Sequence, residues 1–335
     1  MQWNYGFDFG SEALRMVSVG RKGIYSEPQC AAIRQGEELP FAWGDRAFEM
    51  LARPVPGVKV QRAMSGGLPE DTGLVASWVK RIVSAGEKRV LIRRHVLLGV
   101  SPGIGRYAAQ ELLGELITQG IDSAGLIALD ACALIGAGVD IGRSEGRFLL
   151  DIGSSAVSLS AFAYGKRALF FRMPYGIGSV DDNIVGEIRQ KEGVIISGSV
   201  ARVLKHGAFS PELDKMALPA FNPASMLPEH RCFDASYARD CVNRFIAEII
   251  RFCRQSTQDL SPQLAEDYLK NGVVITGGGA NIDGMAEGMS AALGVPAFCA
   301  EEPENSAARG LKLLLQDEDK AAALVTSAKE AEERL

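Results

Sequence analysis

Apolar residues along the chain follow two different periods, which predict helices and strands in alternation. Continuous or alternating apolar runs, typical of strands, cover residues 1–20, 90–100, 126–129, 148–172 and 272–276. Apolar residues at helical spacing occupy 72–85, 105–119, 130–138, 238–256 and 306–315, and a further helical pattern ends at Leu293. Strands that alternate with helices are typical of an α/β protein. We therefore expect mixed sheets covered by helices.

One strand–turn–strand pattern occurs twice. Residues 7–16 align without a gap with residues 150–159 of the stretch 149–159, so that Asp8 matches Asp151, Gly10 matches Gly153 and Ser11 matches Ser154. Such a repeat indicates two related halves, each with a glycine turn. Two ordinary hairpins with Asp-Gly turns remain the alternative interpretation.

Composition narrows the function classes. The 335 residues suffice for about two domains, and a net charge of −5 without a dense Lys/Arg cluster argues against nucleic acid as a partner. The six scattered cysteines form no C-x-x-C pair and indicate free thiols in a reducing cytoplasm. No apolar run approaches the roughly 18 residues of a membrane span, so we expect a soluble or peripheral protein. Trp3 is a candidate for an interfacial membrane anchor.

Three glycine turns follow apolar strands, at 8–11, 151–154 and 276–279. Phosphates bind backbone N–H groups that no Cβ obstructs, and Mg²⁺ prefers carboxylate oxygens. These turns therefore predict a site for a nucleoside phosphate, with Asp8 and Asp151 near the metal. The alternative is that both aspartates only cap their turns. The chain lacks the Walker pattern G-x-x-x-x-G-K-[ST], which excludes a P-loop.

These motifs resemble those of the actin-like ATPase superfamily and, within it, most closely the bacterial rod-shape-determining MreB family. Residues 7–14 are similar to the first phosphate loop, D-L-G-T-A-N-T, and residues 151–153 to the start of the second, D-I-G-G-G-T-T-E. Further similarity covers most of the chain. Segment 27–34 resembles N-E-P-S-V-V-A-I-R, and segment 42–47 resembles A-V-G-x-x-A. Segment 135–138 resembles the end of E-E-P-x-A-A-A-I-G-A-G, and segment 274–280 resembles V-L-T-G-G-G-A. Segment 300–303 resembles A-E-D-P, and segment 308–310 resembles A-R-G.

The resemblance implies an α/β, actin-like fold, in which two similar mixed-sheet domains flank a nucleotide cleft and each carries a smaller inserted subdomain. The first domain would span 1–142 with an insertion at about 29–64, and the second 143–305 with an insertion at about 181–237. Residues 306–335 would form a helix that returns to the first domain, followed by a charged tail.

The resemblance also implies ATP and Mg²⁺ as cofactors, with Asp8 and Asp151 at the metal. The implied nucleotide-binding residues are Asp8, Gly10, Ser11, Asp151, Gly153, Ser154, Gly176, Gly277, Gly278 and Gly279. The implied partners are further copies of the chain in a filament, the cell-wall elongation machinery and the membrane surface. The implied location is the cytoplasm, peripheral to the inner face of the cell membrane.

The chain departs from the family pattern where hydrolysis would occur. The threonine pair of the second loop falls on Ala156 and Val157, and the catalytic glutamate falls on Ala128 or Leu129. Asp130 is the nearest acid and the one catalytic candidate, although a side chain one position along points in another direction.

In the first loop Glu12 replaces a small residue. Its carboxylate near phosphates is unfavourable unless Mg²⁺ or a basic group offsets it.

These observations predict an MreB-like cytoskeletal protein that forms membrane-associated filaments, determines cell shape and guides cell-wall synthesis. It would bind ATP with weak or absent hydrolysis, because orienting the attacking water contributes much of the rate of phosphoryl transfer. Whether the chain is an enzyme stays open. A non-polymerising actin-fold adaptor and a small-molecule kinase of the same fold are the alternatives.

Overall fold

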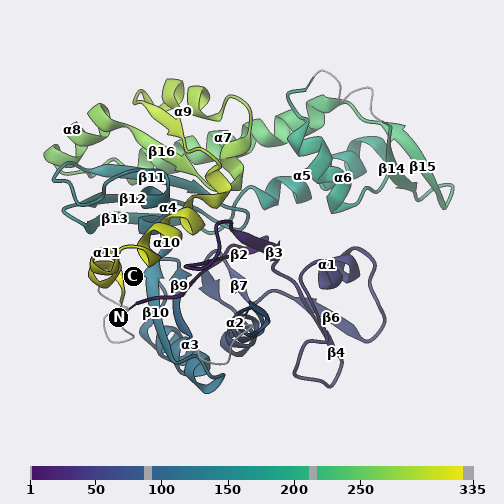
Figure 1. Ribbon diagram of the computed structural model, residues 1–335. Helices are drawn as coiled ribbons and strands as arrows, with labels where there is room; N and C mark the ends of the chain where they lie inside the picture. Colours follow the sequence, from purple (N-terminus) through teal and green to yellow (C-terminus); the bar gives the residue numbers. More distant parts are fainter. Residues whose placement is uncertain (1, 87–92, 211–216, 327–335) are drawn as a thin grey trace. The chain divides into compact units, whose positions relative to one another are not determined.

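A computed structural model describes residues 2–86, 93–210 and 217–326 (Figure 1). The chain divides into two compact units, one of Met1–Leu149, Ser160–Phe170 and Ala300–Leu335, the other of Leu150–Leu159 and Phe171–Cys299. The expected domain boundaries near 142 and 305 stay predictions. Part of the expected strand at 90–100 and the end of the charged tail, residues 327–335, lie outside the described residues.

The first unit is built on a five-stranded sheet in the order β10-β9-β1-β2-β3. Strand β1 runs antiparallel to β2 and parallel to β9, which is in turn parallel to β10. The strands are β1 (Tyr5–Phe9), β2 (Ala13–Ser18), β3 (Tyr25–Pro28), β9 (His95–Val100) and β10 (Ser123–Ala128). This order makes β1 a central strand, which explains why all five of its residues are buried.

Helices cover both faces of this sheet, as the alternation of side chains along β1 shows. The ring of Phe9 lies 6.2 Å from that of Trp78 in α2 (Thr72–Gly86), which packs beside α3 (Arg106–Thr118). Gly6 faces the other way, since a Cβ there would lie 3.2 Å from Cβ of Leu311 in α10 (Ser306–Leu315). Asp8, one alternation from Gly6, therefore belongs to the face that α10 covers.

The small-residue helix α4 (Leu129–Gly136) packs closely against α10. A Cβ on Gly136 would lie 1.8 Å from the Ser306 carbonyl oxygen, and a Cβ on Gly310 would lie 1.8 Å from that of Cys132. Because neither position has room for a side chain, the two glycines permit contact between the helix backbones. The A-R-G motif at 308–310 thus contains a packing glycine.

A smaller sheet, β5-β4-β6, and a two-stranded sheet, β7-β8, complete the first unit with α1 and α11. Their bounds are β4 (Ala31–Arg34), β5 (Ala42–Trp43), α1 (Asp45–Ala52), β6 (Val58–Gln61), β7 (Met64–Ser65), β8 (Leu68–Pro69) and α11 (Glu318–Leu324).

A second five-stranded sheet has the order β13-β12-β11-β16-β17. Its strands are β11 (Arg147–Ile152), β12 (Val157–Ala163), β13 (Lys166–Met173), β16 (Val273–Thr276) and β17 (Ala297–Cys299). Among its described residues the second unit contains a hairpin and five helices. The hairpin strands are β14 (Ala217–Asn222) and β15 (Leu227–Cys232), and the helices are α5 (Gly178–Glu192), α6 (Gly198–His206), α7 (Ala235–Ser256), α8 (Pro262–Asn271) and α9 (Met285–Leu293). The expected α/β class is confirmed.

The interpretation of Trp3 as an interfacial membrane anchor is wrong. Its side chain is 8% exposed and packs in an apolar core with Val17, Leu97 and Leu311. A Cβ on Gly125 would lie 2.8 Å from the Trp3 ring, so the indole fills a space that a glycine leaves. Burial therefore takes this aromatic away from any surface. Among the described residues, no helix has both the length and the apolar character needed to cross a membrane.

Candidate functional site

The first candidate phosphate turn joins β1 to β2 in the first unit. Asp8 and Ser11 are buried, at 5% and 8% exposure. A Cβ on Gly10 would lie 2.9 Å from the Ala13 carbonyl oxygen, so the turn requires glycine. The Arg15 guanidinium lies 3.8 Å from the Asp8 carboxylate, which places a positive charge beside the turn.

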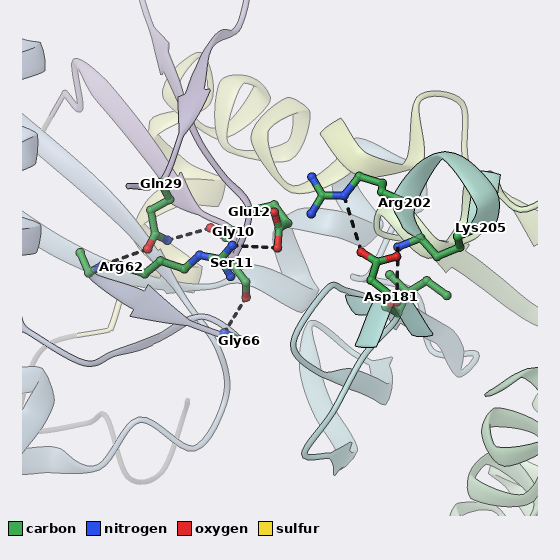
Figure 2. Close-up of polar contacts among 11 residues, drawn as sticks. Gly10, Ser11, Glu12, Gln29, Arg62, Gly66, Asp181, Arg202 and Lys205 are labelled. Carbon is green, nitrogen blue, oxygen red and sulfur yellow. Dashed lines mark hydrogen bonds and ion pairs between the residues drawn. The ribbon is translucent and has the colours of Figure 1, made fainter. Parts of the chain in front are cut away.

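Side chains hold this turn against the segment 62–66 (Figure 2). The Ser11 hydroxyl accepts a 2.9 Å hydrogen bond from the Gly66 N–H, and the Gln29 amide donates to the Gly10 carbonyl at 2.7 Å. Arg62 lies 3.0 Å from the Glu12 carboxylate. The basic group needed to offset the charge of Glu12 is therefore present.

The second candidate turn joins β11 to β12 and has the same local geometry. A Cβ on Gly153 would lie 3.0 Å from the Ala156 carbonyl oxygen, three residues on, as at Gly10. The Asp151 carboxylate accepts a 2.9 Å hydrogen bond from the Thr276 hydroxyl. Since Thr276 ends β16, this bond joins the second turn to the strand that leads into the third.

The turn at 176–178 packs directly on the second turn. The N–H of Ile177 donates to the Gly153 carbonyl and that of Gly178 to the Ser154 carbonyl, both at 2.9 Å. A Cβ on Gly176 would lie 2.2 Å from the Gly153 carbonyl oxygen. Gly176 is thus required by backbone contact with the second turn.

The third glycine turn follows β16 and lies against the same segment. Gly277 has φ +82°, and a Cβ there would lie 2.5 Å from the Ile152 carbonyl oxygen. A Cβ on Gly279 would lie 2.3 Å from Cγ2 of Ile152. Gly278 differs, because it is exposed and a Cβ there would meet nothing within 4 Å.

The structure therefore brings together most of the expected nucleotide-binding residues of the second unit. Contacts join the turn that holds Asp151, Gly153 and Ser154 to Gly176, Gly277 and Gly279, and Gly278 lies between the last two. The expected residues of the first unit, Asp8, Gly10 and Ser11, share the single turn after β1.

Asp130, the catalytic candidate, is held in an ion pair. Its carboxylate, in a residue 4% exposed, receives hydrogen bonds from Nε and Nη2 of Arg167 at 2.8 and 2.7 Å. One of its oxygens also accepts a 2.8 Å hydrogen bond from the Ala131 N–H in the first turn of α4. The rings of Phe162 and Phe170 lie within 6 Å of the Arg167 guanidinium and help to fix it. The ion pair of Asp130 and Arg167 is therefore a structural contact.

Leu129 occupies a position expected for the catalytic glutamate. Its side chain packs on two glycines. A Cβ on Gly99 would lie 2.5 Å from Cδ2 of Leu129, and a Cβ on Gly67 would lie 3.1 Å from Cδ1 of Leu129. Burial and the carboxylates of Asp130 and Asp8 raise the pKa of the Cys132 thiol well above its usual range. Helix α4 therefore carries the apolar side chain of Leu129, the ion-paired carboxylate of Asp130 and the unreactive thiol of Cys132.

Several polar side chains around these turns were not expected from the sequence. Gln29, Arg62 and Arg167 contact residues far away in the chain, and no periodic pattern marks such contacts. In the second unit the buried Lys205 ammonium lies 2.7 Å from the Asp181 carboxylate and donates to the Ile177 carbonyl at 3.4 Å (Figure 2). These bonds fix the 176–178 turn to helix α6.

Comparison with known proteins gives a consistent result. A sequence profile of the MreB/Mbl protein family matches residues 2–323. The chain is 22% identical over 320 residues to the cell shape-determining protein Mbl of Bacillus subtilis (strain 168), covering 94% of this chain and 96% of Mbl. It is 23% identical over 313 residues to the cell shape-determining protein MreB of Escherichia coli (strain K12), covering 90% of each.

Solved structures show the same fold. The crystal structure of MreB5 of Spiroplasma citri bound to ADP superposes with a TM-score of 0.86 at 20% identity, covering 95% of this chain and 97% of MreB5. A MamK double helical filament superposes with a TM-score of 0.76 at 15% identity, covering 93% and 98%. The expected actin-like fold is confirmed, and the resemblance recognised in the sequence motifs holds along the whole chain. The chain belongs to the MreB/Mbl family as a divergent member.

Proposed function

We propose that this protein is a cell-shape cytoskeletal protein that binds adenine nucleotide at its glycine turns and hydrolyses it weakly or not at all. The observation that carries the nucleotide site is the group of three glycine turns in the second unit, in contact backbone to backbone. Such turns present N–H groups that no Cβ obstructs, as phosphate binding requires. Gly278 in the third turn is exposed, and a Cβ there would meet nothing within 4 Å, so a ligand could approach it without displacing protein atoms.

The residues present fit a nucleotide with its metal. Asp8 and Asp151 each lie two residues before a turn glycine, where they would hold Mg²⁺. Within the described residues no group of three or more His, Cys, Asp and Glu side chains gathers as a metal site, so the phosphates would supply other ligands. When bound, the ion neutralises phosphate charge. The MreB5 structures, which hold ADP and AMPPNP, support the nucleotide part of this proposal.

Weak or absent hydrolysis follows from the surroundings of α4. Asp130 is engaged by Arg167, and Leu129 is an apolar side chain packed on two glycines. A water-orienting group must accept a hydrogen bond from the attacking water, which Leu129 is unable to do. Bound ATP would therefore stay largely unhydrolysed.

The proposed partners are further copies of the chain in a filament, the inner face of the cell membrane and the cell-wall elongation machinery. The family of the chain and the filament formed by MamK support self-assembly. Weak turnover also suits the alternative of an actin-fold adaptor, which would bind nucleotide without polymerising.

Titration with a fluorescent ATP analogue, with and without Mg²⁺, tests the nucleotide site. We expect the wild type to bind and Gly278→Arg to lose binding, because the long side chain would enter the space above the third turn. Gly288→Arg is the matched control, since Gly288 is an exposed helical glycine of the same unit with nothing within 4 Å of its Cβ position. Equal, negligible binding by wild type and Gly278→Arg would reject the site.

Sedimentation of purified protein with ATP and anionic vesicles separates the filament from the adaptor. A filament former pellets above a critical concentration and depends on nucleotide. Protein that binds nucleotide but stays monomeric at high concentration with ATP and lipid would favour the adaptor.

A further inference from the structure

Three side-chain contacts hold the turn after β1 against residues 62–66 and Gln29 (Figure 2). One backbone hydrogen bond, from the Gln29 N–H to the Glu12 carbonyl at 3.0 Å, adds to them. Ser11 accepts from Gly66, Gln29 donates to Gly10, and Arg62 pairs with Glu12. Every residue of the turn from Gly10 to Glu12 is therefore fixed from outside the hairpin. An ordinary hairpin turn needs no such support, because its strands fix its register.

Gln29 is the central element of this arrangement. Its side chain is completely buried and makes hydrogen bonds with both of its ends. The amide nitrogen donates to the Gly10 carbonyl at 2.7 Å, and the amide oxygen accepts from the N–H groups of Ala63 and Met64 at 3.0 and 2.9 Å. Only a side chain with a donor and an acceptor joins the turn to the segment in this way.

The ion pair of Glu12 and Arg62 adds an electrostatic effect to the mechanical effect, which is the fixing of the turn by the hydrogen bonds of Gln29. A carboxylate two residues after Gly10 repels any phosphate at the turn. Arg62 lies 3.0 Å from that carboxylate, and both side chains are about one-third exposed, at 33% and 35%. The guanidinium therefore cancels a charge that would otherwise oppose ligand binding.

We propose that Gln29 and Arg62 are positioning residues of the first phosphate turn: Gln29 keeps the turn in its ligand-accepting shape before any nucleotide arrives, and Arg62 neutralises Glu12. This inference rests on the proposed nucleotide binding for its charge part only. The turn would be pre-organised by the protein, so binding would not have to order it, which preserves affinity.

Nucleotide titration of Arg62→Ala, Glu12→Gln and the double variant tests the charge part. Arg62→Ala leaves Glu12 uncompensated, and we expect the affinity for ATP to fall roughly tenfold at low salt. Adding Glu12→Gln removes the charge with little change of shape, so the double variant should return to within about twofold of wild type. Adenosine, which carries no phosphate, should bind all four proteins equally.

Two results would overturn the charge part. If the double variant binds ATP as weakly as Arg62→Ala, Arg62 acts on the ligand itself and not through Glu12. If adenosine binding falls together with ATP binding, the substitution disturbs the fold and not a charge. A wild type that binds no nucleotide would reject the proposed function instead, and the mechanical part would then be decided separately.

Hydrogen exchange in nucleotide-free protein decides the mechanical part. In Gln29→Ala the backbone amides of residues 10–14 should exchange at least about tenfold faster than in wild type, while those of residues 153–157 in the second turn keep their rates. Should Gln29→Ala fail to fold, Ser11→Ala, which removes the hydroxyl that accepts from the Gly66 N–H, gives the same measurement with a smaller change. Unchanged exchange at 10–14 in a folded variant would show that the segment does not hold the turn.

Discussion

The two related hairpin turns of this chain share one backbone geometry but are supported in different ways. In each, the turn glycine faces the carbonyl oxygen three residues on. A Cβ would lie 2.9 Å from that oxygen at Gly10 and 3.0 Å from it at Gly153. Side chains of Gln29, Ser11 and Arg62 supply most of the contacts that hold the first turn, beside one backbone hydrogen bond from the Gln29 N–H to the Glu12 carbonyl. Backbone groups of two further glycine turns hold the second.

This difference decides how each turn responds to substitution. A side-chain contact is lost in steps, because one hydrogen bond or one charge can be removed while the rest remain. A contact between two backbones admits no added atom, so even a methyl group must move the chain. A single substitution in the second turn should therefore cause a large loss of stability, whereas substitutions at the first turn should each cause a smaller loss.

The largest effect is expected for Gly277→Ala in the second unit. The added Cβ would lie 2.5 Å from the Ile152 carbonyl oxygen and 2.9 Å from a carboxylate oxygen of Asp151, at a residue with φ +82°. Both the clash and the left-handed backbone oppose alanine, so we expect a loss of about 3 kcal/mol or more in the free energy of unfolding. Urea denaturation followed by circular dichroism measures it.

Gly278→Ala is the control for this substitution. It adds the same methyl group one residue along, where nothing lies within 4 Å, and should change stability by less than about 0.5 kcal/mol. Similar losses for the two variants would contradict the claim that backbone contact supports the second turn.

An intermediate effect is expected for Gln29→Met in the first unit. Methionine fills a similar volume but makes none of the three hydrogen bonds, so the half-buried Gly10 carbonyl and the buried N–H groups of Ala63 and Met64 lose this partner. We expect a loss of about 2 kcal/mol, since the neighbouring chain can move to recover part of the bonding. The exposed Gln35→Met should be neutral in the same thermal or urea melt. Equal stability of the two variants would show that the Gln29 amide contributes nothing.

Much of the fold was predictable from sequence because periodicity reports burial. The helices expected at 72–85, 105–119 and 306–315 are present as α2, α3 and α10. Helix α8 was not expected, because its apolar residues are few and only Tyr268 is buried. Its ends do carry a signal: the Ser261 hydroxyl caps its first turn, Pro262 begins it and Gly272 follows it.

The sequence marks the candidate site most clearly at the glycines that the backbone requires. Gly10, Gly153, Gly176 and Gly277 stand out in a sequence because no other residue fits their positions. The partners of Glu12 and Asp130 did not stand out. Arginine usually lies on the surface, and the fold brings Arg62 and Arg167 each to an acid that is distant in the sequence. No local sequence pattern around either arginine predicts that contact.

The smallest expected effect separates the two turns by salt. The pair of Glu12 and Arg62 is partly exposed and worth about 0.5 kcal/mol, whereas the contacts of Gly153 with Ile177 and of Ser154 with Gly178 join uncharged backbone groups. Raising KCl from 0.05 to 1 M should therefore speed amide exchange at residues 10–14 about twofold and leave 153–157 unchanged. The double variant Glu12→Gln and Arg62→Ala should lose this dependence, because it has no pair left to screen. A salt response that survives in the double variant would assign it to the rest of the fold, and the first turn would then be held, like the second, by uncharged contacts alone.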